Sequence, residues 1–263
     1  MQRLHLLSYN IQAGIESRRY GDYVTQGWKH LLPHPERQEN LARIAPLLRE
    51  FDMVGLQEVD AGSLRSGYVD QIEYLAQSAG FPFWYKQVNR NLGHLAQHSN
   101  GLLCRLQPQR VIEHRLPGGL PGRGAVVAEF PTSDGESLAV CIVHLALGWR
   151  ARRRQLGYLV DLVERQPYVV IMGDFNCDCR SRSLRSLVAG QDLHGLDCDL
   201  KTFPSWRPRR NLDHILLSRP LKVVEARVID YPMSDHLPLS AVIALPAGVE
   251  LMDGAAVPQA RVG

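Results

Sequence analysis

The sequence has no long hydrophobic run, few cysteines and little net charge. Its apolar stretches are all shorter than the roughly 18 residues that a membrane-spanning helix needs. The first residues, Met1–His5, lack the basic segment and apolar core of a secretory signal. Five cysteines in 263 residues are an odd number and too few for a disulfide scaffold. We therefore expect a soluble cytoplasmic protein with reduced thiols and no transmembrane segment.

The charge balance and the hydrophobic content each exclude a class of protein. The chain has 30 Lys and Arg against 27 Asp and Glu, a formal net charge of +3. So small an excess does not fit a protein that coats nucleic acid, but it allows an anionic substrate to bind at one local patch. Hydrophobic residues make up 45% of the chain, which excludes global disorder.

Short β-rich runs alternate with a few helical patterns, and no repeat or long linker divides them. We expect about ten strands and four helices in a single domain over residues 1–246, followed by a loose tail over 247–263 that is rich in Ala, Gly and Pro. The helices are expected at 36–50, with Pro46 as a kink or restart, and at 68–79, 150–164 and 183–188. Residues 14–35 and 88–99 are expected to form long loops, which are often functional.

Polar side chains stand where the expected strands end. Asn10, Glu58 and His144 each end a strand, and Asp174 and Asn176 follow the apolar run 168–172. Asp213 opens a later strand, and Ser234-Asp235-His236 precedes the last one. Carboxylates and amides gathered at one edge of a sheet make an oxygen-rich site that suits Mg²⁺ or Mn²⁺. Such a cation can bind a phosphate and lower the pKa of a water molecule.

In order along the chain, these segments resemble the motifs of the endonuclease/exonuclease/phosphatase superfamily. The matching segments are Ser-Tyr-Asn-Ile-Gln (8–12), Leu-Gln-Glu-Val (56–59), Asn-Gly-Leu-Leu-Cys-Arg (100–105), Val-His-Leu (143–145), Gly-Asp-Phe-Asn (173–176), Leu-Asp-His-Ile (212–215) and Ser-Asp-His-Leu-Pro-Leu (234–239). The resemblance runs from residue 3 to about 245. It implies an α/β fold, a four-layer sandwich of two packed mixed β-sheets flanked by helices.

The resemblance also implies roles for the polar residues. Glu58 would be the main ligand of a Mg²⁺ or Mn²⁺ ion, with Asn10 beside it and Asp235 near a second metal position. Asp174 would orient or deprotonate the attacking water, and Asn176 would hold the phosphate or a metal-bound water.

The two histidines and the remaining polar residues complete the implied site. His236 would contact the scissile phosphate, and Asp213 would fix its tautomer. His144 would be a second histidine facing the phosphate. Asn100 would line the cleft and bind substrate.

Each residue also has a simpler interpretation. Asp174 could be an ordinary turn residue, and Asn10 or Asn100 a strand or turn terminator. His144 and His236 could be core histidines bonded to the backbone. A structural zinc site on Cys177, Cys179, His194 and Cys198 is a further alternative, although Cys-x-Cys is tighter than the usual zinc spacing.

The sequence therefore predicts a metal-dependent hydrolase of phosphodiester bonds, with a phosphate-ester substrate and in-line attack by water. Nucleic acid, DNA or RNA, is favoured somewhat over phospholipid head groups. Arg150–Arg154 and Arg207–Arg210 flank expected catalytic segments, and each cluster could guide a phosphate-bearing substrate or could be ordinary solvated surface. A phospholipid or sphingomyelin-type head group and an inositol phosphate are the alternatives. A non-catalytic binding module on the same fold is the other class. No protein partner is predictable, and a monomer is the default.

Overall fold

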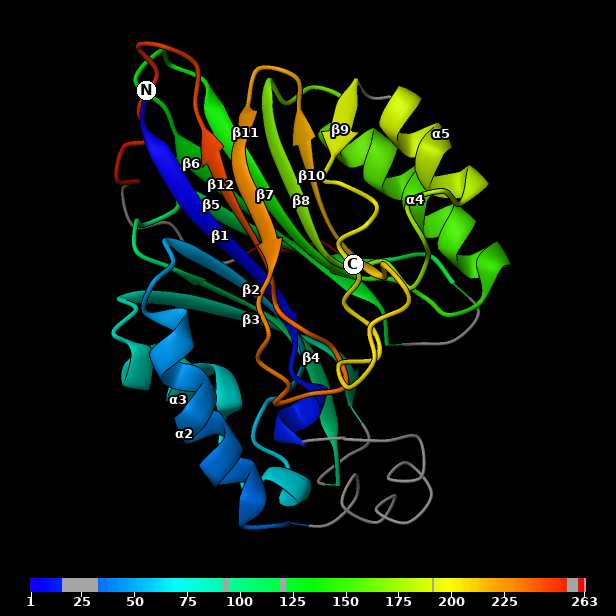
Figure 1. The fold of residues 1–263 in the computed structure, drawn as a ribbon. Helices are drawn as coiled ribbons and strands as arrows, with labels where there is room; N and C mark the ends of the chain where they lie inside the picture. Colours follow the sequence, from blue (N-terminus) through cyan, green and yellow to red (C-terminus); the bar gives the residue numbers. More distant parts are fainter. Residues whose placement is uncertain (16–32, 92–94, 119–121, 191, 255–259, 263) are drawn as a thin grey trace.

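The computed structural model describes residues 1–15, 33–91, 95–118, 122–190, 192–254 and 260–262. It confirms the expected four-layer sandwich: two mixed sheets pack face to face, and helices cover both outer faces (Figure 1). The first sheet has the order β11 (Lys222–Val228), β12 (Leu239–Ala244), β1 (Arg3–Asn10), β2 (Met53–Asp60), β4 (Gln97–Cys104), β3 (Phe83–Asn91). The second has the order β13 (Ala260–Val262), β5 (Arg110–Arg115), β6 (Gly124–Pro131), β7 (Ser137–His144), β8 (Tyr168–Asp174), β10 (Asp213–Ser218), β9 (Leu193–Gly195).

Three layers of apolar packing hold the sandwich together. Side chains from both sheets, among them Leu6, Met53, Ile142 and Met172, form the central core. Helices α2 (Glu36–Leu48) and α3 (Gln71–Ala79) pack on the outer face of the first sheet. Helices α4 (Trp149–Val163) and α5 (Arg182–Gly190) cover the second sheet. Apolar positions spaced three and four apart in each helix face its sheet, and burying them supplies most of the helical stability.

Some local expectations need correction. Pro46 does not interrupt α2, which continues to Leu48; the ring lies in the last turn of the helix. Strands β5, β9 and β13 are additional to those expected, because β5 carries charged residues and the other two have three residues each. Most of the expected loop 88–99 is β3 and β4, whereas most of the expected loop 14–35 lies outside the described residues. Two short 3₁₀ helices, η1 (Gln12–Gly14) and η3 (Leu64–Ser66), complete the described elements.

The segment after Pro246, expected to be loose, is packed in its described part. Val249 and Leu251 are buried in the central core, and the backbone N–H of Leu251 donates to the side chain of Gln2. Strand β13 pairs in parallel with β5. The two apolar side chains provide burial that the local composition does not reveal.

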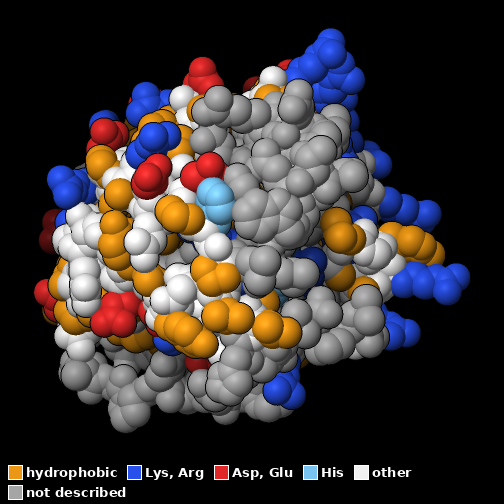
Figure 2. All heavy atoms as spheres, turned by 90° about the horizontal axis from the view of Figure 1, so that it is seen from below, with side chains coloured by type: hydrophobic (Ala, Val, Ile, Leu, Met, Phe, Trp, Pro, Cys, Tyr) orange, Lys and Arg blue, Asp and Glu red, His pale blue; other side chains and the backbone are white. Residues whose placement is uncertain are grey.

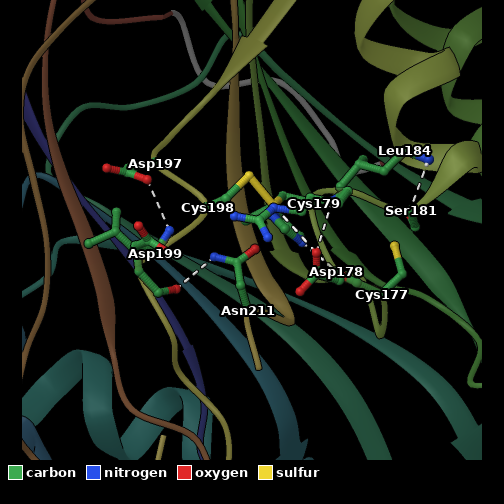
Figure 3. The surroundings of a disulfide bond; sticks show 12 residues. Cys177, Asp178, Cys179, Ser181, Leu184, Asp197, Cys198, Asp199 and Asn211 are labelled. Atoms are coloured by element: carbon green, nitrogen blue, oxygen red, sulfur yellow. Dashed lines mark hydrogen bonds between the residues drawn. A yellow bond between two sulfur atoms is a disulfide. The ribbon is translucent and has the colours of Figure 1, made fainter. Parts of the chain in front are cut away.

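The cysteines also differ from expectation. Cys179 and Cys198 form a disulfide, and Figure 3 shows it joining the loop after β8 to the segment before Asn211. Because these two sulfur atoms are bonded to each other, the four-ligand zinc alternative is wrong, as is the expectation that all thiols are reduced. Cys104, Cys141 and Cys177 are free and buried. Among the described residues, no helix is long and apolar enough to cross a membrane.

Candidate active site

Strand register places three of the expected residues in one row. His144 at the end of β7 lies opposite Asp174 at the end of the parallel strand β8. Asp174 in turn lies opposite Asp213, the first residue of the antiparallel strand β10. Gly173 allows the tight packing of β7 and β8, since a Cβ there would lie 1.9 Å from the carbonyl oxygen of Val143. The row therefore depends on a glycine in the Gly-Asp-Phe-Asn motif.

The first sheet contributes Asn10 and Glu58. Asn10 ends β1 and is buried. Glu58 has a φ of +56° and interrupts the pairing of β2 with β4 between Leu56 and Val59. Such a bulge re-aims a side chain, and positive φ in a residue other than glycine is a strained state typical of functional sites. Asn10 Nδ2 lies 3.3 Å from Glu58 Oε1 and 3.2 Å from Asp174 Oδ2, and so joins the two sheets.

Asp174 is at the centre of the cluster. Its Oδ1 accepts a 2.8 Å hydrogen bond from the backbone N–H of Asn176, whose side chain donates to the carbonyl of Leu145. Burial raises the pKa of Asp174 to about 7, and the carboxylates of Asp213 and Glu58 add to the rise against the opposing effects of His236 and the Asn176 N–H. This carboxyl group can therefore exchange a proton near neutral pH.

His236 is held in place by Asp213. His236 Nδ1 lies 2.7 Å from Asp213 Oδ2, and the Thr202 hydroxyl donates to the same oxygen. Burial alone would lower the pKa of His236, but Asp213 and Asp174, together with the hydrogen bond, raise it well above 6.5. His236 is thus an imidazolium at neutral pH. Thr202 could not be predicted from the sequence, because a single threonine in a loop belongs to no recognisable motif.

His144 is in the opposite state. Its Nε2 lies 3.5 Å from Asp174 Oδ2 and 3.8 Å from Glu58 Oε1. Burial, and next the positive charges of Arg123 and His236, lower the pKa of His144 well below 6.5. His144 is therefore a neutral imidazole that faces two carboxylates.

A pocket of about 570 Å³ opens beside this centre and is lined by Glu58, His144, Asn100, His98 and Arg123 among others. Asn100 is fully buried, and its Nδ2 donates to the carbonyl of Gly124. The charge of Arg123 adds to burial in lowering the pKa of His144, and it opposes the rise in the pKa of Glu58 that burial causes. Asp235 is also buried nearby and accepts a hydrogen bond from the Ser234 hydroxyl.

The charges of the site fit a divalent cation. Removal from water, and next the charge of Asp235, raise the pKa of Glu58, although a third of its side chain is exposed. The pKa of Asp174 is raised as well. Both carboxylates are therefore costly to ionise in this buried cluster, and a bound cation would compensate their charge. Asp174, Asp213 and His236 offer ligand atoms within 4.8 Å of one another. However, a protonated His236 cannot ligate a metal, whereas Glu58 offers carboxylate oxygen atoms, which Mg²⁺ and Mn²⁺ prefer. Asn10 beside it has one further oxygen, Oδ1, which accepts a hydrogen bond from the Gln12 N–H.

Comparison with known proteins agrees with the fold. Residues 7–236 match the model of the Endonuclease/Exonuclease/phosphatase family. The chain therefore belongs to this family of phosphoester hydrolases, as the motifs predicted. Among curated proteins, none matches this chain significantly in sequence.

Solved structures show the same architecture at low sequence identity. An endonuclease/exonuclease/phosphatase from Beutenbergia cavernae is 19% identical, with a TM-score of 0.72 over 94% of this chain and 72% of the other. A mannosyl-6-phosphatase from Bacteroides thetaiotaomicron is 17% identical, with a TM-score of 0.67 over 92% and 100%. The human nocturnin catalytic domain, solved with a sulfate anion, is also 17% identical, with a TM-score of 0.66 over 92% and 93%.

Proposed function

We propose that this protein is a metal-dependent hydrolase of phosphodiester bonds, with Asp174 as the group that activates the attacking water. One observation carries the proposal: Asp174 Oδ2 lies 3.5 Å from His144, whose pKa is lowered, and 3.8 Å from His236, whose pKa is raised. Titratable neighbours held in opposite states are typical of an acid–base site. A carboxyl with a pKa of about 7 is well matched to general base catalysis at neutral pH.

The other residues of the site bind the cation, contact the phosphate or orient a catalytic group. Glu58 and Asn10 would hold a divalent cation, with Asp235 near a second position; when bound, the cation supplies charge neutralisation at the phosphate. His236 stabilises negative charge on the phosphate or protonates the leaving oxygen, and Asp213 keeps it protonated and aligned. Asn176 fixes Asp174 through its backbone N–H. His144, neutral and beside Glu58, hydrogen-bonds to the phosphate.

Nucleic acid remains the favoured substrate class. Arg150, Arg153 and Arg154 at the start of α4 are exposed, as are Arg207, Arg209 and Arg210 in the loop before Asp213. Figure 2 shows Lys and Arg side chains gathered at one edge of the molecule, on the side where α4 and α5 lie in Figure 1. A polyanion would be attracted to such a surface, and its affinity would fall with salt.

Substrate assays test this choice. Purified protein with Mg²⁺ or Mn²⁺ is incubated with supercoiled plasmid, single-stranded RNA, or vesicles containing sphingomyelin and phosphatidylcholine. Nicking or RNA cleavage that EDTA abolishes, and that Glu58→Gln reduces when the metal is limiting, supports the proposal. Release of phosphocholine from the vesicles without cleavage of either nucleic acid would replace it with the head-group alternative.

The cellular compartment is a separate question. Disulfides are rare in the cytosol of most cells, so the Cys179–Cys198 bond argues against the cytoplasmic location that the sequence suggested. Fractionation of cells that produce the native protein, followed by thiol labelling of each fraction, would distinguish the cytoplasm from an oxidising compartment.

A further inference from the structure

The first turns of helix α4 carry positive charges, which are unfavourable at a helix N-terminus. Its N-cap is Gly148, which offers no side-chain hydrogen bond, and its first turn contains no acidic residue. Four arginines follow instead: Arg150, Arg152, Arg153 and Arg154. Exposed N–H groups make a helix N-terminus partly positive, so acidic residues stabilise it and basic residues destabilise it. Such a conflict between local preference and structure is typical of a functional site.

The start of α4 faces the catalytic pocket. Gly148, Arg150 and Ala151 line the same pocket as Glu58 and His144. The loop that leads into the helix is fixed in place, since Arg152 donates to the carbonyls of Ala146 and Leu147 at 3.0 and 2.8 Å. In addition, the buried side chain of Gln155 accepts a 2.8 Å hydrogen bond from the N–H of Ala146. Arg152 thus has a structural task, whereas Arg150 is exposed beside the pocket.

A second feature of the pocket also points to a ligand. The Oδ1 of Asn100 is buried and has no hydrogen-bond partner among the described residues. Its orientation is fixed, because Nδ2 is engaged by the carbonyl of Gly124 at 3.0 Å. A buried acceptor without a donor costs about 1–3 kcal/mol. Asn100 lines the pocket, so a hydroxyl or amine of a bound molecule can supply the missing donor.

We propose that the N-terminus of α4 and Arg150 bind a second phosphate of the substrate, while the scissile phosphate lies at Glu58 and His144. Asn100 Oδ1 accepts a hydrogen bond from the same molecule. The inference rests on the proposed function and adds the requirement for two phosphates. The second phosphate can be a further phosphate group on the polyol of a small phosphodiester, or it can be the next phosphate of a nucleic-acid strand.

Isothermal titration calorimetry with paired ligands tests the subsite and separates the two sources. One pair is glycerophosphoinositol and glycerophosphoinositol 4-phosphate, and the other is d(TpT) and d(TpTpT). Every protein carries Asp174→Asn, so that the ligands persist in Mg²⁺. We expect the ligand with the additional phosphate to bind about tenfold more tightly in one pair, and that pair identifies the source.

Two substitutions then locate the subsite. Arg150→Gln should bring the affinity ratio of that pair close to one. Arg165→Gln, the same charge change beyond the other end of α4, should leave the ratio as it was. The inference is wrong if neither pair shows a preference, or if Arg150→Gln leaves the preference intact.

A third variant separates ligand binding from helix stability. Ala151→Asp places a carboxylate in the first turn of α4, where it should raise Tm because it complements the helix dipole. The same carboxylate should abolish the preference for the second phosphate by repulsion. A higher Tm with an unchanged preference would mean that the helix start binds no phosphate. Failure of the proposed function is seen independently, as absence of any phosphodiester hydrolysis by the wild-type protein.

Discussion

His144 and His236 both lie within 4 Å of Asp174 Oδ2, at 3.5 and 3.8 Å, yet their pKa values are shifted in opposite directions. The difference comes from their surroundings. Burial lowers the pKa of both histidines. At His236 the nearby Asp213 and Asp174, with the hydrogen bond to Asp213, outweigh burial, whereas at His144 the charges of Arg123 and His236 add to it. Two identical side chains at one carboxylate can therefore carry out different steps of a phosphoryl transfer.

Asp174 should make the metal-free protein less stable as the pH rises. The folded protein keeps the Asp174 proton up to about pH 7, whereas the unfolded chain loses it near the ordinary aspartate pKa of 3.8. Between these values the folded state binds more protons, so the free energy of unfolding falls with increasing pH. In EDTA, Asp174→Asn should therefore raise Tm relative to wild type at pH 8 and not at pH 4, as measured by calorimetry. An equal Tm difference at both pH values would contradict the raised pKa.

Asp213→Asn should impair the reaction by changing the protonation of His236. Without the carboxylate, the pKa of His236 falls, so activity at high pH should be lost at a lower pH than in wild type. We expect kcat to decrease roughly 10²- to 10⁴-fold. Thr202→Val removes only a hydroxyl from the same Asp213 oxygen and should shift the pH profile less. Coincident pH profiles for wild type and Asp213→Asn would show that Asp213 does not act through His236.

Glu58→Gln should weaken the binding of the divalent metal. The substitution keeps the size of the side chain and removes the charge that would hold the cation, so the metal concentration for half-maximal activity should rise by roughly tenfold or more. Glu129→Gln, on β6 away from the pocket, is the matched control and should titrate as wild type does. Titration of Mn²⁺ into EDTA-treated proteins measures the effect, and superimposable curves for all three proteins would exclude Glu58 as a ligand.

The Cys179–Cys198 disulfide should stabilise the fold. It closes a loop between residues 19 positions apart, for which loop entropy predicts about 3 kcal/mol. Cys198→Ser should therefore unfold at lower urea concentration than the oxidised wild type. A reducing agent should lower the midpoint of the wild type and leave that of Cys198→Ser unchanged. If reduction does not move the wild-type midpoint, the bond does not contribute to stability.

Much of the fold and of the candidate site could be predicted from the sequence. The features that could not be predicted depend on contacts between distant segments. Asn10 and Asp174 end their strands and Glu58 lies near the end of β2, where apolar runs stop at polar residues, so these positions could be predicted. Their convergence also requires the face-to-face packing of the two sheets, which only the family resemblance implied. The positive φ of Glu58, the hydroxyl of Thr202 on Asp213 and the opposite states of the two histidines depend on packing between segments far apart in the chain. Burial of Val249 and Leu251 could not be predicted either, because local composition does not show what a segment packs against.

The most direct test is hydrolysis of bis(p-nitrophenyl) phosphate by wild type and Asp174→Ala, each with Mg²⁺, Mn²⁺ or EDTA. p-Nitrophenyl phosphate is measured beside it to detect monoesterase activity. We expect metal-dependent release of p-nitrophenol from the diester by the wild type, which EDTA abolishes and Asp174→Ala reduces by at least about 10²-fold. Turnover that persists in Asp174→Ala, or no turnover of the diester by the wild type with either metal, would contradict a phosphodiesterase centred on Asp174.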